Sequence, residues 1–430
     1  MPERLLALRD ARRQGIVRGL VSVCSAHPLV LRAAMDQARA DGTPLLVETT
    51  CNQVNHLGGY TGMTPGIFRD FVRDLAAQAD LPPGQILLGG DHLGPGPWRH
   101  EAPDLAMATA ADMVDSYVAA GFRKIHLATA VPCAGEPRLL SEQVAAQRTA
   151  ALCARAEAAY ALEPAGQPPV YVVGTEGPAA GGARSEDPKV VISTPEAVER
   201  TLDLLQDAFA REGVGDAWDR VVALVVQPGV QFSETAVHPY DRKRARALAG
   251  AAGARGPWMF EAHATDYQHP RALAELVEDG FGILKVGPWL TFACREALFA
   301  LEDIAKEARR LDGEPPHIEL REVLDRAMRR NPVHWKDHHR GSPGEQSYAR
   351  LFSYSDRSRH YWTDPEVEAE VDRLLEVTAG PLPRQLLSQH LPQALEAILD
   401  GDLEPSGHAI VLHAIRRVLG HYAAACRVRV

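Results

Sequence analysis

A regular alternation of apolar runs and helical stretches fills the first 310 residues of the chain. Eight short runs are continuously apolar, which is typical of parallel strands buried on both faces. They span residues 19–24, 44–49, 85–90, 124–129, 170–175, 221–227, 258–263 and 282–287. Because a strand followed by a helix recurs eight times over about 270 residues, the pattern predicts an α/β fold, a (β/α)8 TIM barrel, which typically needs about 250 residues.

The expected helices carry recognisable start signals. Thr64 and Thr194 each precede a proline, an arrangement that favours an N-cap residue followed by the first helical position. Apolar residues then recur at helical spacing and predict one buried face for each helix. These residues are Ile67, Phe71 and Leu75 in the first helix, and Val198, Leu202, Leu205 and Phe209 in the second.

An alternative fold, the open doubly wound sheet, is disfavoured, and the rest of the chain forms a second expected part. An open doubly wound sheet usually has fewer strands and often a glycine-rich nucleotide turn, and no such turn follows residues 19–24. After residue 310 the pattern changes to helical stretches and turn signals without strand pairs. We therefore expect a barrel over residues 1–310 and a helical C-terminal extension over residues 311–430, packed on the barrel.

Composition and charge exclude several classes of function. The chain of 430 residues has a formal net charge of -10 and no long block of Lys or Arg, whereas nucleic-acid binding needs a clustered basic face. No apolar run approaches the roughly 20 residues of a membrane span, and the charged N-terminus lacks the core of a signal peptide. The six cysteines are scattered without a CxxC pair, as in reduced proteins. We expect a cytoplasmic protein that binds neither nucleic acid nor membrane.

Titratable residues stand at the ends of the expected strands, where barrel enzymes gather their chemistry. They include Glu48, Asp91, His92, Glu176, His263 and Lys285. Burying such groups without partners would cost several kcal/mol each, so an apolar barrel has no reason to place them together. We therefore predict that these side chains meet around a single opening.

A metal site is the first chemical hypothesis for this opening. His92, Glu176 and His263 would supply mixed nitrogen and oxygen ligands suited to a divalent metal, zinc first, with manganese or cobalt as alternatives. Asp91 beside the ion would act as a general acid or base. In a regular strand Asp91 and His92 point to opposite faces, so their convergence requires the strand ladder to end at about Asp91.

Each of these assignments has a structural alternative. The histidines could be hydrogen-bonded at the mouth without a metal, and Asp91 could orient a neighbour. Glu48 either moves a proton or pairs with Lys285. His126 lies inside its strand and is expected to be a packed barrel histidine.

Substrate contacts are expected from the loops at the same end of the barrel. The loops 50–62 and 176–189 are long and glycine-rich and could fold over a ligand. An anion site is expected after the last two strands, where small residues leave backbone N–H groups accessible at helix starts, and Arg357 and Arg359 could reach over the mouth from the tail. The expected substrate-binding residues are Asn52, His56, Tyr60, Gln227, Thr265, Asp266, Lys285, Gly287 and Arg357.

Five stretches resemble the Z-type subunit family of tagatose-1,6-bisphosphate aldolase, a family also labelled tagatose-6-phosphate kinase. They are LLVETTCNQVNHLGGYTG (45–62), LLGGDHLGP (87–95), YVVGTEGPAAGGA (171–183), FEAHATDYQ (260–268) and GFGILKVGPWLTFACREALFALE (280–302). The resemblance spans essentially the whole chain, including YSDRSRHYW (354–362) in the tail. It implies a (β/α)8 barrel related to the class II, metal-dependent ketose-bisphosphate aldolases.

Carried over residue by residue, the aldolase pattern is only partly present. Asp91 matches the catalytic acid/base, His92 and His263 match zinc ligands, and Glu176 falls near the glutamate of the fifth strand. A further zinc histidine at the sixth strand is missing from residues 221–232, and the glycine-serine phosphate turn after His263 is replaced by HATD. These departures disfavour ordinary bisphosphate aldolase activity.

Two functions are weighed against each other, and a sugar-binding barrel without turnover is a third possibility that the sequence leaves open. The first is a metal-dependent enzyme acting on a ketohexose or its phosphate, in which retro-aldol opening of the C3–C4 bond leads to 4-epimerisation or to cleavage. The second is a non-catalytic stabilising subunit of a class II tagatose-1,6-bisphosphate aldolase, which would be its partner. A kinase is not supported, because the chain has no GxxxxGK[ST] loop. In either case we expect a small ketose or ketose phosphate as ligand and a homo-oligomeric assembly.

Overall fold

A closed ring of eight parallel strands forms the centre of the computed structural model, which describes residues 2–174, 190–252, 258–311 and 318–427. The strands follow one another around the ring in the order β1-β10-β9-β6-β5-β4-β3-β2. Each overlaps one of the eight expected runs, so the predicted (β/α)8 barrel is confirmed. Their bounds are β1 (Leu20–Cys24), β2 (Leu45–Thr50), β3 (Ile86–Leu93), β4 (Lys124–Leu127), β5 (Val170–Val173), β6 (Val221–Val225), β9 (Met259–Ala262) and β10 (Phe281–Val286).

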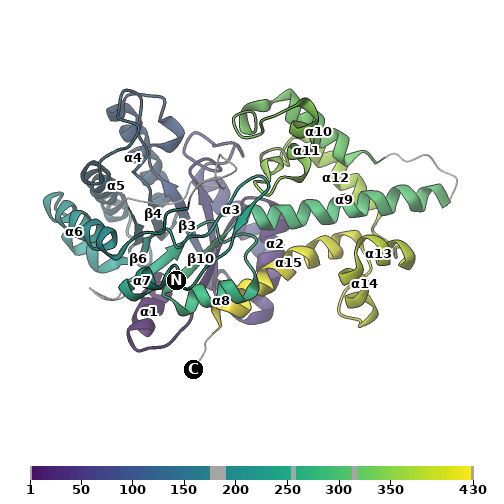
Figure 1. The fold of residues 1–430 in the computed structure, drawn as a ribbon, viewed down its shortest axis with the longest axis horizontal. Coiled ribbons are helices and arrows are strands. Elements are labelled where there is room, and N and C mark those ends of the chain that lie inside the picture. Colours follow the sequence, from purple (N-terminus) through teal and green to yellow (C-terminus); the bar gives the residue numbers. More distant parts are fainter. Residues whose placement is uncertain (1, 175–189, 253–257, 312–317, 428–430) are drawn as a thin grey trace.

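Helices surround the ring (Figure 1), and the two helices for which a cap was predicted begin at that cap. They are α2 (Pro28–Asp41), α3 (Pro65–Gln78), α4 (Pro103–Ala119), α5 (Glu142–Leu162), α6 (Pro195–Arg211), α7 (Arg246–Ala251), α8 (Pro270–Glu278) and α9 (Pro288–Leu311). The side chains of Thr64 and Thr194 accept hydrogen bonds from the backbone N–H groups three residues later, as predicted. The predicted face of α6 is buried.

The predicted face of α3 is partly correct, because Phe71 and Leu75 are partly buried against the core whereas Ile67 is not. Ile67 is 54% exposed, and the buried positions are instead Phe68, Val72 and Ala76. Two neighbouring stripes of this helix are apolar, and packing against the barrel, rather than spacing alone, selects the one that is covered.

The N-terminal helix α1 (Pro2–Arg13) closes one end of the barrel. Leu5 and Leu8 are buried in a cluster with inward-facing apolar residues of the strands, among them Leu46, Leu87 and Met259. This apolar plug seals the barrel end from which β5 and β6 start, because α1 contacts both of these strands. The opposite end, where the strands finish, is left for polar side chains.

The C-terminal part is helical, as expected. It consists of α10 (Leu320–Arg330), α11 (Pro343–Phe352), α12 (Pro365–Val377), α13 (Arg384–His390), α14 (Pro392–Leu399) and α15 (Gly407–Cys426). The long helix α9 runs out to this part, and α15 returns beside α9 to contact α2 and α8 of the barrel (Figure 1). The last helix thus joins the outer layer of the barrel, and the boundary at residue 311 stays a prediction. No helix in the described ranges is both long and apolar enough to cross a membrane.

The end of β3 departs from regular strand geometry. Its pairing with β2 runs as far as Thr50 and Asp91, whereas its pairing with β4 shifts register between Gly90 and Leu93. His92 has a φ of 51°, in the left-handed region that side chains rarely adopt. This turn of the backbone lets the neighbouring side chains of Asp91 and His92 approach the same opening.

Gly89 leaves a gap in the ring of inward-facing side chains. It pairs with Glu48 of β2 on one side and with Lys124 of β4 on the other. Because Gly89 has no side chain, the Glu48 carboxylate reaches across it to Lys124, with 2.5 Å between Oε1 and Nζ. A Cβ atom at this position would lie 2.6 Å from Oε1 of Glu48.

We predict that Gly89→Ala destabilises the barrel. The added methyl group would push the Glu48 carboxylate away from Lys124 and leave two buried charges poorly paired, so the free energy of unfolding should fall by about 3 kcal/mol or more. Urea unfolding followed by circular dichroism measures this. Gly84→Ala is the matched control, because a Cβ there meets no described atom within 4 Å. Equal losses in the two variants would contradict the role of the gap.

Candidate functional site

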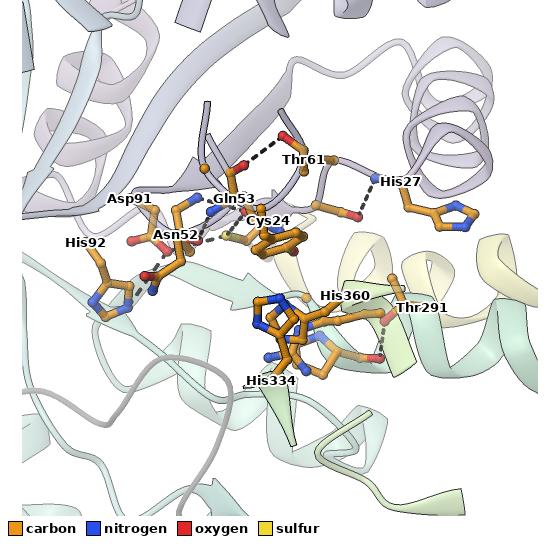
Figure 2. A pocket seen from close by; sticks show the side chains of 18 of the residues that line it. Cys24, His27, Asn52, Gln53, Thr61, Asp91, His92, Thr291, His334 and His360 are labelled. Carbon is orange, nitrogen blue, oxygen red and sulfur yellow. Dashed lines mark hydrogen bonds and ion pairs between the residues drawn. The ribbon is translucent and has the colours of Figure 1, made fainter. Parts of the chain in front are cut away.

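One cavity of about 1610 Å³ extends from the mouth of the barrel to the helical C-terminal part. Its inner end is lined by residues of the barrel strands and of the loops that follow them, and its outer end by residues that follow α10 and α11. Figure 2 shows Asp91 and His92 of the inner end as one group and His334 and His360 of the outer end as another. The site is therefore built by two parts of the chain that are far apart in sequence.

Three histidines converge at the inner end of this cavity. The ring centroid of His92 lies 4.9 Å from that of His126 and 4.8 Å from that of His263, and the last two are 5.0 Å apart. Asp91 joins them through a hydrogen bond of 2.7 Å between Oδ1 and Nδ1 of His126. The four residues can each offer one ligand atom within 4.8 Å of the others. This arrangement brings His92 and His263 together, as predicted, and adds His126.

The electrostatics of the histidines suit metal ligands. Burial lowers the pKa of His263 to about 4 and the pKa of His92 well below its usual value, so both rings are neutral near pH 7. Nε2 of His263 lies 2.8 Å from Glu261 Oε1, whereas its Nδ1 is buried without a partner in the described part of the chain. A carboxylate on one ring nitrogen and a free lone pair on the other is the usual state of a metal-binding imidazole.

A layer of buried charges lies next to the histidines. Lys285 Nζ contacts Asp91 and lies 2.6 Å from Glu48 Oε2, and Lys124 Nζ lies 2.7 Å from Glu261 Oε2. Three carboxylates and two ammonium groups leave this set with one excess negative charge while the histidines are neutral. A divalent cation at the histidines would offset that charge, so the residues present fit a metal.

Asp91 stays ionised in this surrounding. Burial alone would raise the pKa of Asp91, but His92, the Lys285 ammonium and the hydrogen bond to His126 together hold it well below its usual range. The Cys24 thiol donates to its other oxygen over 3.4 Å, and burial raises the pKa of that thiol. Asp91 is therefore a charged proton acceptor that lines the cavity.

Most of the predicted site residues line this cavity. They are Asn52, Tyr60, Asp91, His92, His263, Asp266, Lys285, Gly287 and Arg357. Glu48 is fully buried and pairs with Lys285, which favours the structural alternative for this residue over a role in proton transfer. Glu176 lies outside the described residues.

Three of the expected substrate contacts find no support in the geometry. His56 packs against Trp98, and Gln227 uses its Oε1 to accept a hydrogen bond from Gly229 N. The Thr265 hydroxyl is fully buried and donates to the backbone carbonyl of Lys285. Because each side chain is used by its own loop or by packing, none of the three lines the cavity.

The expected anion site at the start of α9 is filled by the protein itself. Oδ1 of Asp266 accepts hydrogen bonds from Gly287 N at 3.0 Å and from Trp289 N at 2.8 Å. Of these two backbone groups, the N–H of Gly287 is one that was expected to be accessible to an anion. The anion site is absent because Asp266, which stands in place of a glycine-serine turn, caps the helix with its own negative charge.

Three residues of the site were missed from the sequence. His126 was expected to be a packed barrel residue, and Lys124 and Glu261 were not considered. Alternation within the strands could have identified them: Lys124 and His126 are two residues apart on β4, and Glu261 precedes His263 by two. Neighbours at this spacing point to the same face of a strand, which here is the barrel interior.

Comparison with known proteins gives a consistent result. A sequence profile of the family described as D-tagatose-1,6-bisphosphate aldolase subunit GatZ/KbaZ-like matches residues 5–427. A protein of Agrobacterium fabrum named D-tagatose 6-phosphate 4-epimerase is 47% identical over 420 residues, which cover 97% of this chain and 97% of the relative.

Two solved structures are also similar. A probable tagatose 6 phosphate kinase from Sinorhizobium meliloti 1021 is 45% identical, with a TM-score of 0.87 over 95% of this chain and 100% of the other. A fructuronate-tagaturonate epimerase from Cohnella laeviribosi is 12% identical, with a TM-score of 0.50 over 96% of this chain and 82% of the other, and this likeness shows the fold alone.

We predict that Asp266→Asn changes how stability depends on pH. Burial raises the pKa of Asp266 to about 6 from a usual value of 3.8, despite the two backbone N–H groups. The folded protein thus binds this proton more tightly than the unfolded chain. Protonated Asp266 therefore contributes up to about 3 kcal/mol to the free energy of unfolding below about pH 4, and this contribution is lost as the pH rises through about 6. Asparagine can accept the same hydrogen bonds without ionising.

The measurement is urea unfolding of the wild type and the variant at several pH values in this window. The stability of the variant relative to the wild type should increase with pH. Asp104→Asn, at an exposed position in the first turn of α4, should show no such trend. A difference that is constant with pH would contradict the assignment.

Proposed function

Because the chain belongs to the D-tagatose-1,6-bisphosphate aldolase subunit GatZ/KbaZ-like family, we propose that it is an epimerase that interconverts D-tagatose 6-phosphate and D-fructose 6-phosphate. The observation that carries the proposal is the group of three histidines around the ionised Asp91 at the inner end of the cavity. The name of the relative from Agrobacterium fabrum supports it.

His92, His126 and His263 would hold a divalent metal, for which we propose zinc, with manganese or cobalt as alternatives. Three imidazoles with a position left open for substrate are a common arrangement for a catalytic metal. When bound, the metal supplies a Lewis acid for the ketose carbonyl. The carboxylate of Glu261 contacts the ring of His263 and fixes its orientation.

The two sugar phosphates differ only in the configuration at C4, so the reaction must open and re-form a bond at this carbon. Asp91 accepts the proton of the C4 hydroxyl, and the electron pair of the C3–C4 bond moves to the C2–C3 half as an enediolate. C4 becomes an aldehyde. After this aldehyde presents its other face, the C3–C4 bond forms again and the proton returns to the C4 oxygen. Lys285 contributes by keeping Asp91 ionised in the resting site.

Incubation of the purified protein with D-tagatose 6-phosphate tests the proposal directly. The formation of D-fructose 6-phosphate is followed by a coupled assay before and after dialysis against a chelator, and again after Zn, Mn or Co is added back. We expect turnover to be lost with the chelator and restored by at least one metal. No turnover in any metal-loaded sample would show the proposed function to be wrong.

We predict that His263→Gln loses the metal together with the activity. The variant removes one of three ligands, and metal affinity should fall by at least about 100-fold. Metal content after gel filtration, measured by mass spectrometry, gives a readout independent of turnover. His100→Gln is the matched control, because His100 is exposed beyond the cavity. Retention of a full metal equivalent by His263→Gln would contradict the assigned ligand set.

A further prediction concerns the proton acceptor. Asp91→Asn keeps the size of the side chain but removes its charge, so kcat should fall by about 100-fold or more while KM changes little. Steady-state kinetics on the metal-loaded variant measure this, and circular dichroism confirms that it is folded. Asp104→Asn serves again as the control. A variant that keeps more than about a tenth of wild-type kcat would exclude Asp91 as the acid/base.

A further inference from the structure

A second group of side chains, aromatic and basic, lines the outer end of the same cavity. The rings of His334 and His360 stack with centroids 4.5 Å apart and an angle of 10°, and Tyr60 meets His360 edge-on at 4.5 Å. Arg357 and Arg359 flank them on the 3₁₀ helix η5 (Arg357–His360). We call Arg357, Arg359, His334 and His360 the basic cluster. Figure 2 shows its two histidines together and apart from Asp91 and His92.

His360 lacks the partners that a buried ring normally has. Both of its ring nitrogens are buried, and neither has a hydrogen-bond partner among the residues that the structure describes. A buried polar atom without a partner is costly, and in a native structure it commonly marks a site for an absent ion or ligand. Burial and the surrounding Arg359, Arg357, His334 and His338 hold the pKa of this ring well below its usual value. His360 therefore lies among basic side chains, and its ring nitrogens have no hydrogen-bond partner in the described part of the chain.

Hydrogen bonds connect the segment that carries Arg357, Arg359 and His360 to the barrel helix α9. Asp356, next to η5, accepts hydrogen bonds from Thr291 Oγ1 at 2.6 Å and Arg295 Nε at 2.9 Å, both on α9. A third bond of 2.8 Å comes from Ser358. The carboxylate of Asp356 thus forms an ion pair with Arg295. Carboxylates also line the outer part of the cavity, among them Asp337, Asp364 and Asp372.

The location usual for phosphate in a barrel of this kind is closed. Asp266 occupies the N-terminus of α9 with its carboxylate and would repel a second anion there. If the carbonyl end of a sugar phosphate lies at the three histidines, its phosphate needs another anion-binding site within the same cavity. The basic cluster offers guanidinium groups and unused ring nitrogens, the donors that bind phosphate best in proteins.

We propose that the basic cluster is the subsite for the 6-phosphate group of the substrate, and that it retains the aldehyde half of the sugar while the C3–C4 bond is open. This inference rests on the proposed function. Cleavage of this bond places C4, C5, C6 and the phosphate on one fragment, glyceraldehyde 3-phosphate, and leaves the electron pair on the other. A fragment anchored through its phosphate can turn and add back, which gives epimerisation. A fragment without an anchor diffuses away, which gives cleavage.

Binding of inorganic phosphate tests the subsite without turnover. Isothermal titration calorimetry compares the metal-loaded wild type with Arg359→Gln and His360→Asn. Arg359 also donates to the backbone carbonyl of Asp356 at 3.0 Å, whereas His360→Asn removes no hydrogen bond that the structure contains. We expect phosphate to compete with D-tagatose 6-phosphate and to bind at least about tenfold more weakly in both variants. Arg384→Gln, exposed on α13, should bind phosphate as the wild type does.

Kinetics test the role in retention. In both cluster variants KM for D-tagatose 6-phosphate should rise at least about tenfold, and the preference of the enzyme for D-tagatose 6-phosphate over D-tagatose without phosphate should decrease. The fraction of turnovers that release glyceraldehyde 3-phosphate, measured with its dehydrogenase, should also increase. Arg359→Lys, which keeps the charge, should recover part of the loss.

Separate outcomes would overturn the separate claims. Absence of competition by phosphate, or equal phosphate affinity in the wild type and both cluster variants, overturns the subsite. Weakened phosphate binding without any additional release of glyceraldehyde 3-phosphate overturns the retention role. A wild type that binds phosphate through Arg359 and His360 but never interconverts the two sugars leaves the subsite in place and refutes the proposed function instead.

Discussion

The pairing of buried charges inside the barrel is the constraint on which the rest of the structure depends. Two lysines and three carboxylates fill the space between the apolar plug of α1 and the open mouth, and they touch across strands that are far apart in sequence. Removing any one of them would leave a partner charged and unsolvated, which costs more than the pair gains. Gly89 is part of the same constraint, because only a position without a side chain lets Glu48 reach Lys124. An apolar core would have been simpler to stabilise, so the charges indicate a use at the mouth.

The buried charges contact side chains at the mouth of the barrel and control their properties. Lys285 is shared by Glu48 and Asp91, so it links the interior to Asp91, whose carboxylate lines the cavity. Glu261 in the same way links Lys124 to the ring of His263. The buried charges therefore fix the orientation and charge state of Asp91 and His263 before any ligand binds. Such preorganisation is what an enzyme needs where charge develops during a reaction.

Periodicity in the sequence was sufficient for the fold, because each strand and cap is a local signal. It was less informative about the site. Asp91, His92 and His263 could be predicted, because they stand where strands end. Lys124, His126 and Glu261 were missed because each lies within a run that was interpreted as uniformly apolar, although the spacing of two residues marks them as facing inward. The filled helix start at Asp266 and the stacking of His334 on His360 depend on contacts between segments that no local pattern reports.

The proposed site needs both the barrel and the C-terminal part, because each of them lines one end of the cavity. In the barrel alone, the start of α9 would be the natural place for a phosphate, but Asp266 occupies it. The segment after α11 is tied to α9 by Asp356, so it carries its arginines and His360 to the other end of the cavity. An anion bound there would lie in the same cavity as the three histidines, but at its outer end. In the proposed reaction, the histidines and Asp91 would act at the C3–C4 bond while the basic cluster would hold the phosphate on C6, which is the arrangement that re-addition of a cleaved fragment requires.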